Sequence, residues 1–430
     1  MTHRLSAIIT AMLDAPFSSS AESAIHTREL PNGLTLLAEP IDGVQSLGMT
    51  LLLPAGTIYE PDDRQGTAGV LAELICRGAG GRSAREHSDE LDRLGVHRST
   101  NAGGRHLQLS ATMIGSKLDD ALPLLLDMVT RPNLEDAAFA PSRELALQSL
   151  AALEDEPQQR AMVNLTRSHF PKPFDRVSTG VREHVEALSA DDVREMWKRC
   201  FVPGGAVLAF AGQLDPDRLR ARVEEQLADW SGHLREPAPE GDAEHGYHHE
   251  TSDTAQTHLA LAHDAVPESD SRSTLQRAAT AVLSGGMSGR LFTEVREKRG
   301  LCYAVFARYA GQRDRGAVMT YAGTTPARAQ ETLDVVTHEL RRLGEGIDED
   351  EFERARTGMK SRLVMQGEST SARAASLASD FYHLGRARSL DEMAAEVDAV
   401  KLDELIDFAW DHRPERITVC SIGPEALRPA

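Results

Sequence analysis

Histidines gathered in one short segment and cysteines scattered along the chain are the residues whose types first suggest metal or redox chemistry. The segment HGYHHE, from His245 to Glu250, holds four titratable groups that could bind a transition metal, although in a polar stretch such groups are usually solvated. No two cysteines form a CxxC pair, so neither a zinc ribbon nor a disulfide framework is predicted. We therefore expect a reducing compartment and a cytoplasmic location. The cysteines are Cys76, Cys200, Cys302 and Cys420.

A glycine-rich run, Gly285 to Gly289 (GGMSG), is a candidate binding loop. Glycines let a backbone approach a bound peptide closely or let a loop hinge, and they are also ordinary in turns. The run lacks the strand-Gly-x-Gly-x-x-Gly context of a dinucleotide site and the lysine of a P-loop. We expect Gly285, Gly286 and Ser288 to lie in a flexible loop that lines a substrate chamber.

The net charge of the chain argues against some classes of binding partner. It has 430 residues, with 47 Lys and Arg against 66 Asp and Glu, and a formal net charge of −19. This balance argues against duplex DNA or an anionic membrane, because phosphate neutralisation needs clustered basic residues, and it would suit a positively charged substrate. No apolar run approaches the ~20 residues of a membrane helix. The stretch Leu5 to Leu13 is expected to belong to an amphipathic or disordered extension, with a secretory signal as the alternative.

The chain repeats itself with an offset of about 210 residues. The segment LSADDVREMW, which ends at Trp197, matches VKLDELIDFAW, which ends at Trp410. Earlier, the stretch Gln45 to Leu53 has a counterpart at Gln256 to Ala262. A constant offset implies two homologous domains.

Strand and helix patterns follow the same order in each repeat. Residues His258 to Leu261 alternate with a period of two, whereas apolar residues over 118–129 recur at helical spacing. Strands mixed with clustered helices favour an α+β fold in which helices cover one face of a sheet. We expect an extension over 1–25, a first domain over 26–230, a linker over 231–254 and a second domain over 255–430.

Three segments together carry a family resemblance: LPNGL (Leu30 to Leu34), GTAGVLAELICRG (Gly66 to Gly78) and LSGGMSGRLFTEVREKRGLCYAV (Leu283 to Val305). In this order and spacing the chain resembles the pitrilysin or insulinase family of metallopeptidases, which includes mitochondrial processing peptidase. The resemblance extends from about Thr27 to Gly423. It implies two homologous domains, each a mainly antiparallel sheet covered by helices, that together form a half-clamshell.

Active members of that family carry the motif His-x-x-Glu-His on a helix. Its two histidines project from one face and coordinate zinc, while the glutamate takes a proton from water on the metal. Aligning the end of the family motif with Cys76 to Gly78 puts Gly69, Ala72 and Glu73 at these three positions. The resemblance therefore implies a degenerate motif.

Neither a shifted alignment nor a later helix restores the ligands. If Glu73 becomes the general base, Val70 and Leu74 occupy the ligand positions. The family's further glutamate ligand would lie on the helix Glu144 to Glu154, where Ser149 stands instead.

Two nearby histidines, His87 and His97, lack a partner four residues away on a common helix face. We expect no metal in this chain, and zinc in a partner subunit.

The other half of a peptidase site matches the family better. Arg296 and Tyr303 stand in VREKRGLCY with six residues between them, like the arginine and tyrosine that the family uses opposite the zinc. The resemblance implies that both hydrogen-bond the substrate carbonyl and stabilise oxyanion charge. Without that context, such residues are common surface features. Arg299 is a second candidate for substrate binding, at a less fitting spacing.

A chain that keeps only this half resembles one partner of a heterodimer. We expect a non-zinc subunit of a metallopeptidase, inactive alone, whose partner is a homologous subunit with an intact His-x-x-Glu-His motif. The expected substrates are unstructured peptides, bound as an added strand on a sheet edge, with no nucleic acid and no membrane. The alternatives are an inactive scaffold or peptide-binding protein, and a homodimer that binds peptides without cutting them.

Overall fold

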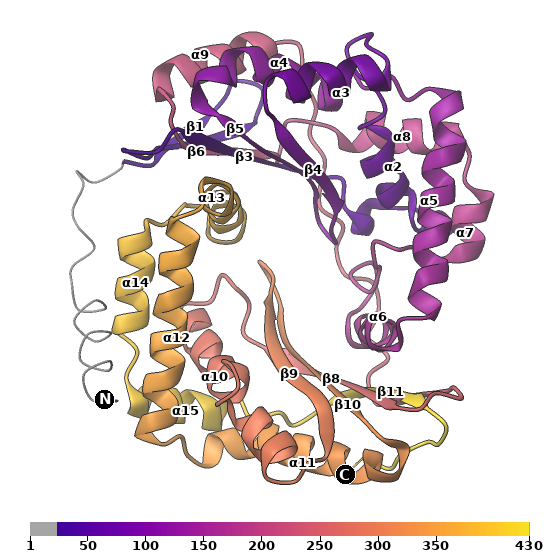
Figure 1. Cartoon of the computed structure of the whole chain (residues 1–430), viewed down its shortest axis with the longest axis vertical. Helices are drawn as coiled ribbons and strands as arrows, with labels where there is room; N and C mark the ends of the chain where they lie inside the picture. The colour runs from indigo at the N-terminus through magenta and orange to yellow at the C-terminus, as the bar shows by residue number, and fades with distance from the viewer. Residues whose placement is uncertain (1–23, 430) are drawn as a thin grey trace.

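The computed structural model describes residues 24–429. Two halves, each with one sheet and a set of helices, together form an open half-clamshell (Figure 1). The first half comprises β1 (His26–Glu29), β2 (Thr35–Pro40), β3 (Ser46–Leu53), α2 (Thr67–Leu74), α3 (Ala84–Arg93), β4 (His97–Ala102), β5 (Leu107–Ile114), α4 (Leu118–Thr130), α5 (Asp136–Glu154), α6 (Pro157–His169), α7 (Arg182–Ala187), α8 (Ala190–Cys200), β6 (Val207–Gly212) and α9 (Pro216–Gln226).

The second half contains a similar set of elements and one π-helical turn, η3. It comprises β7 (Tyr247–Thr251), β8 (Thr257–Ala265), α10 (Ser273–Ser284), η3 (Phe292–Glu297), β9 (Cys302–Gly311), β10 (Gly316–Thr324), α11 (Ala329–Arg342), α12 (Glu349–Gly367), α13 (Thr370–Leu384), α14 (Leu390–Asp398), α15 (Leu402–Asp411) and β11 (Thr418–Gly423).

Both sheets are mainly antiparallel. The strand order is β1-β2-β6-β3-β5-β4 in the first sheet and β7-β11-β8-β10-β9 in the second. Among the strands of the described residues, only the β2–β6 and β7–β11 pairs run parallel. The predicted α+β fold of two homologous halves, each a helix-covered sheet, is confirmed. No helix of the described residues is long and apolar enough to cross a membrane.

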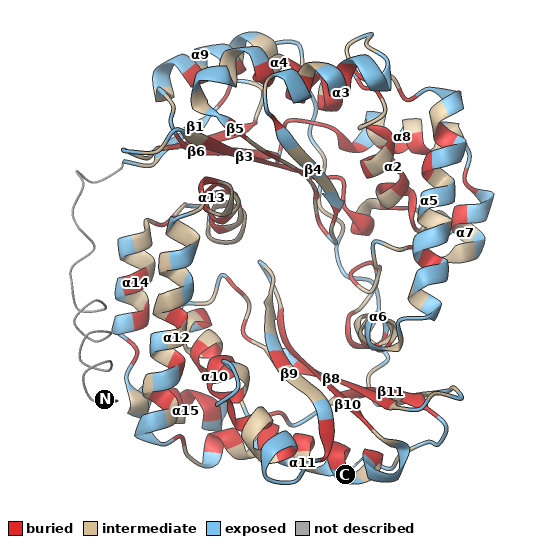
Figure 2. Ribbon diagram, in the orientation of Figure 1, coloured by how far each residue is buried: buried red, intermediate tan, exposed pale blue. Residues whose placement is uncertain are grey.

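The central strands are buried on both faces. All residues of β3 after Ser46 are buried, although a strand with one wet face would alternate. Helices of the same half cover one face of each sheet, and a helix of the opposite half covers the other (Figures 1 and 2). The exchanged helices are α13, which packs on β3 and β6, and α6, which packs on β8 and β11.

Small side chains allow this exchange of helices. On α13, Ala374, Leu377 and Ala378 form one buried cluster with Leu37, Leu52 and residues of β6. A Cβ atom at Gly48 of β3 would collide with the backbone carbonyl of Thr370, so the helix lies directly on the strand there. The two halves therefore share buried cores and are not separate, independently packed domains.

Part of the predicted linker is a strand. Residues Tyr247–Thr251 form β7, which runs parallel to β11 at the edge of the second sheet. Its side chains bond to β11, because the Tyr247 hydroxyl and His249 Nδ1 each lie 2.9 Å from Ser421 Oγ. The polar composition hid this strand, since its pairing partner lies far away in the sequence. Residues 1–23 of the predicted extension, including Leu5 to Leu13, lie outside the described residues.

Candidate peptide-binding and active-site face

The helix that carries the degenerate zinc positions is α2. Ala72 is buried, and its carbonyl accepts a 2.9 Å hydrogen bond from Thr100 Oγ1 on β4. Glu73 forms an ion pair with Arg77 one turn further along the helix. The carboxylate that a shifted alignment would make a general base is thus already engaged by a cation.

A loop covers the position of the first expected ligand. A Cβ atom at Gly69 would lie 2.9 Å from the carbonyl oxygen of Ser178, which is closer than real Cβ contacts allow. A histidine at this position would require the backbone of the loop 176–180 to move. The residues present on α2 therefore do not fit a zinc ion, in chemistry or in space.

The degenerate position Ser149 and the two nearby histidines form other contacts or lie exposed. Ser149 lies exposed on α5, which packs against α2, and its hydroxyl donates a 3.0 Å hydrogen bond to the carbonyl of Leu145. His87 is buried and hydrogen-bonds through Nε2 to the carbonyl of Leu124 at 3.0 Å, whereas His97 begins β4 in an exposed position. Within residues 24–429, no group of three or more His, Cys, Asp or Glu could hold a metal ion.

Glu60 closes the N-terminal end of α2, a role that the sequence did not reveal. Its Oε1 accepts hydrogen bonds from the backbone N–H of Gly66 at 3.1 Å and of Ala68 at 2.7 Å. Its Oε2 is buried and has no partner among the described residues. Burial raises the pKa of Glu60 to about 7, against the lowering effect of the two N–H groups.

Arg296 and Tyr303 lie on two successive elements of the second half, η3 and β9. Arg296 belongs to η3, where its guanidinium stacks over the ring of Phe292 at 4.9 Å. The Lys298 N–H donates to the Thr293 carbonyl, and the chain then turns into β9. Single π-helical turns are frequent at functional sites.

Tyr303 is the extra residue of a β-bulge. Cys302 pairs with Thr324 and Ala304 pairs with Gly323, so no residue of β10 faces Tyr303. A bulge redirects the side chain of its extra residue, and here 61% of Tyr303 is exposed.

Both side chains of this pair are available to a ligand. Within residues 24–429, neither the Arg296 guanidinium nor the Tyr303 hydroxyl has a hydrogen-bond or ion-pair partner. Arg299, the second candidate, is instead paired with Glu294 at 2.7 Å. Arg299 thus differs from Arg296 and Tyr303 because its guanidinium already forms an ion pair.

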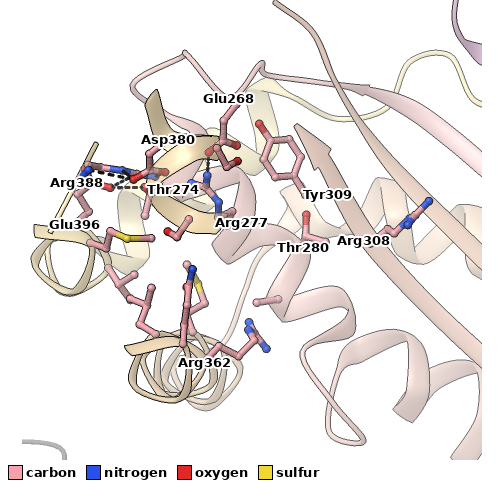
Figure 3. A pocket seen from close by; sticks show the side chains of 18 of the residues that line it. Glu268, Thr274, Arg277, Thr280, Arg308, Tyr309, Arg362, Asp380, Arg388 and Glu396 are labelled. Carbon is pink, nitrogen blue, oxygen red and sulfur yellow. Dashed lines mark hydrogen bonds and ion pairs between the residues drawn. The ribbon is translucent and has the colours of Figure 1, made fainter. Parts of the chain in front are cut away.

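Gly285 of the predicted glycine loop lines a cavity of the second half. This cavity of about 820 Å³ is lined by α10, α12, α13, α14 and β9, and Gly285 lies at its edge. Figure 3 shows its polar lining, in which Arg277 faces Glu268 and Arg388 faces Asp380. Gly286 has a φ of +150°, a conformation that favours glycine, and the adjoining Met287 is 78% exposed. Ser288 follows in the same loop.

A second cavity joins the two halves. It measures about 450 Å³ and lies between the β4–β5 turn and loop 176–179 of the first half and Phe306 and Arg308 of β9. Both β4 and β9 are edge strands with one unpaired side. Sequence reasoning missed this site, because its residues come from distant segments that only the fold brings together.

Comparison with known proteins agrees with this architecture. The family description "Insulinase (Peptidase family M16)" matches residues 41–175, and "Peptidase M16 inactive domain" matches residues 187–359. The chain belongs to the M16 family. The second match runs from the end of α7 through η3 and β9, which carry Arg296 and Tyr303, to α12.

Bacterial M16 relatives align along nearly the whole chain. A protein named "Uncharacterized zinc protease" in Streptomyces coelicolor is 27% identical over 407 residues, covering 92% of this chain and 88% of the relative. One of the same name in Rickettsia felis is 24% identical over 402 residues, covering 93% and 98%.

Solved structures share the M16 fold. A peptidase M16 inactive domain from Pseudomonas fluorescens superposes with a TM-score of 0.83 at 19% identity, covering 94% of this chain and 99% of that one. A protease from Helicobacter pylori also gives a TM-score of 0.83, at 16% identity, covering 94% and 100%. These similarities establish the fold.

Proposed function

We propose that this chain is the non-zinc subunit of a heterodimeric M16 metallopeptidase. The observation that carries the proposal is an asymmetry between the halves. The zinc positions on α2 hold Gly69, Ala72 and Glu73, whereas Arg296 and Tyr303 are exposed and have no hydrogen-bond or ion-pair partner within residues 24–429. Zinc and its general base would come from a homologous partner with an intact His-x-x-Glu-His motif.

The exposed pair supplies the part of the reaction that needs no metal ligand. A guanidinium and a phenol can both donate hydrogen bonds to the carbonyl oxygen of a bound peptide, and they bind it more strongly as negative charge develops there. The bulge and the π-helical turn hold Tyr303 and Arg296 on one short segment. Because no described residue forms a hydrogen bond or ion pair with either group, neither must break such a bond to reach a substrate, and Arg296 has only its stacking contact with Phe292.

The sheet edges supply a binding mode for the peptide. An extended peptide can add as a strand to an unpaired edge, where backbone hydrogen bonds give affinity with little dependence on sequence. The strand β9 ends the second sheet and carries Tyr303 near its start. A peptide added along this edge would pass directly by the proposed pair.

The test is co-purification of the endogenous partner, followed by a zinc assay and a peptidase assay on the complex and on the chain alone. We expect zinc and turnover of unstructured peptides only in the complex. Stoichiometric zinc on the isolated chain, or cleavage by it, would overturn the proposal.

Variants of the pair sharpen the test. Tyr303→Phe removes one hydroxyl and should lower turnover by the complex about 10²-fold without changing assembly, by analogy with the loss of one oxyanion donor. Arg341→Gln on α11 removes an exposed arginine elsewhere in the same half and is the control for general charge effects. Unchanged turnover with Tyr303→Phe would remove the assigned role and favour the second candidate, an inactive peptide-binding scaffold.

A further inference from the structure

The cavity between the two halves has an unusual lining for so acidic a chain. Its charged lining residues are Arg176 and Arg308, and no aspartate or glutamate lines it, although the chain carries a net charge of −19. Amide and hydroxyl groups add further donors from Gln158, Gln159 and Ser178. Such a lining favours an anionic group.

The two arginines differ in how far they are engaged. Arg176 donates to the backbone carbonyls of Thr57, Ile58 and Glu60. It also pairs with Asp62 at 2.5 Å, so these contacts hold it in the wall of the cavity. Arg308 is exposed and has no ion-pair partner within residues 24–429, its polar contact being a 3.8 Å approach to Met319 Sδ. Arg308 also lines the larger cavity, but Figure 3 shows its guanidinium directed away from Arg277 and Glu268 there.

The position of Arg308 places it along the proposed peptide path. It lies on the edge strand β9, two residues from Phe306, so both side chains leave the same face of the strand. Phe306 lines the cavity together with Met162 and Val163 of α6. This wall of the cavity therefore places the unpaired Arg308 guanidinium beside the apolar surface of Phe306, Met162 and Val163. Such a surface suits a ligand that carries a carboxylate next to an apolar side chain.

We infer that this cavity binds a carboxylate of the peptide, with Arg308 as its principal contact. The inference rests on the proposed function, because it takes the ligand to be a peptide. It adds that the bound peptide carries an acidic group, whereas the net charge of the chain by itself suggests a basic one. A guanidinium binds a carboxylate through two parallel hydrogen bonds, so the site selects that group and not merely negative charge. A volume of about 450 Å³ is within the range of small-ligand pockets.

The experiment measures binding of coumarin-labelled peptides to the full chain by fluorescence anisotropy. Three peptides of identical apolar and neutral sequence are compared: one with a free C-terminal carboxylate, one amidated, and one amidated with an internal glutamate. We expect one or both acidic peptides to bind about tenfold more tightly than the neutral one. Which acidic peptide gains affinity distinguishes a terminal carboxylate from a side-chain carboxylate.

Arg308→Gln should abolish that gain and leave binding of the neutral peptide unchanged, while Arg308→Lys should retain part of it. Arg362→Gln is the matched control, because Arg362 is likewise exposed and unpaired within residues 24–429 but lines only the larger of these two cavities. Equal binding of all three peptides, or equal effects of Arg308→Gln and Arg362→Gln, would overturn the inference and leave the proposed function standing. Failure of every peptide to bind would also overturn the inference, whereas the proposed function is decided by the zinc content and turnover of the complex.

Discussion

Arg373 on α13 and Glu39 on β2 form an ion pair that joins the two halves, with Arg373 Nε 2.5 Å from Glu39 Oε2. Arg373 has no solvent exposure and Glu39 only 4%. A second Arg373 nitrogen donates to the carbonyl of Arg388 at 2.6 Å. The pair fastens α13 against the first sheet, at the place where a helix of one half covers the strands of the other.

Breaking this pair should be costly. Arg373→Met removes the cation from a buried carboxylate, and we expect the free energy of unfolding to fall by about 3–5 kcal/mol. Urea denaturation of the full chain measures the change. The double variant Arg373→Met, Glu39→Gln should lose less stability than Arg373→Met alone, because the Glu39 carboxylate is then no longer left charged and without its arginine. A loss no larger than that of the surface control Arg341→Gln would contradict this reading of the pair.

The exchanged helices predict that the halves unfold together. Leu377 of α13 is fully buried against residues of the first half. Leu377→Ala should lower the free energy of unfolding by about 2–5 kcal/mol. Hydrogen exchange should then speed up in β3 and β6 as much as in α13, although the substituted residue belongs to the second half. Faster exchange confined to the second half would show that the shared core does not couple them.

Two helical glycines provide a test of the covered zinc position. In an exposed helix interior, a Gly→Ala substitution raises the free energy of unfolding by up to about 1 kcal/mol. Gly358 on α12 has open space, its nearest neighbour for an added Cβ being an Arg362 nitrogen at 4.0 Å, so Gly358→Ala should show this gain. Gly69→Ala should instead destabilise the chain, because its Cβ meets the Ser178 carbonyl. Thermal unfolding compares the stability of the two variants. Equal gains in stability would mean that loop 176–180 can move aside for the added Cβ atom without cost.

The buried carboxylate at the start of α2 predicts a pH dependence. The folded-state pKa of Glu60 is about 7 against an unfolded value near 4.5, so the folded chain binds the extra proton between these values. Wild-type stability relative to Glu60→Gln should fall as the pH rises from about 4.5 to about 7, by at most about 3 kcal/mol, and then stay level. Urea denaturation of both proteins across this range measures the difference. A difference that does not change with pH would contradict the raised pKa.

Local patterns in the sequence determined much of the fold. Helical spacing over 118–129 predicted α4, because this pattern records which face of the helix is buried. Alternation over His258 to Leu261 predicted β8, although all four of these residues are buried, so the pattern identified the strand but not the covering of its second face. The polar segment that forms β7 escaped the same reasoning, since its strand depends on pairing with β11.

For the site, the sequence by itself determined which chemical groups are present. It showed that no histidine occupies the zinc positions on α2, and that Arg296 and Tyr303 stand at a spacing matching the M16 family. Only the tertiary structure decided that loop 176–180 covers Gly69 and that a bulge turns Tyr303 outward. It also decided that Arg308 meets residues of the first half across a shared cavity. These features depend on contacts between segments far apart in the chain, and periodicity records the burial of a side chain but not the identity of the residue that buries it.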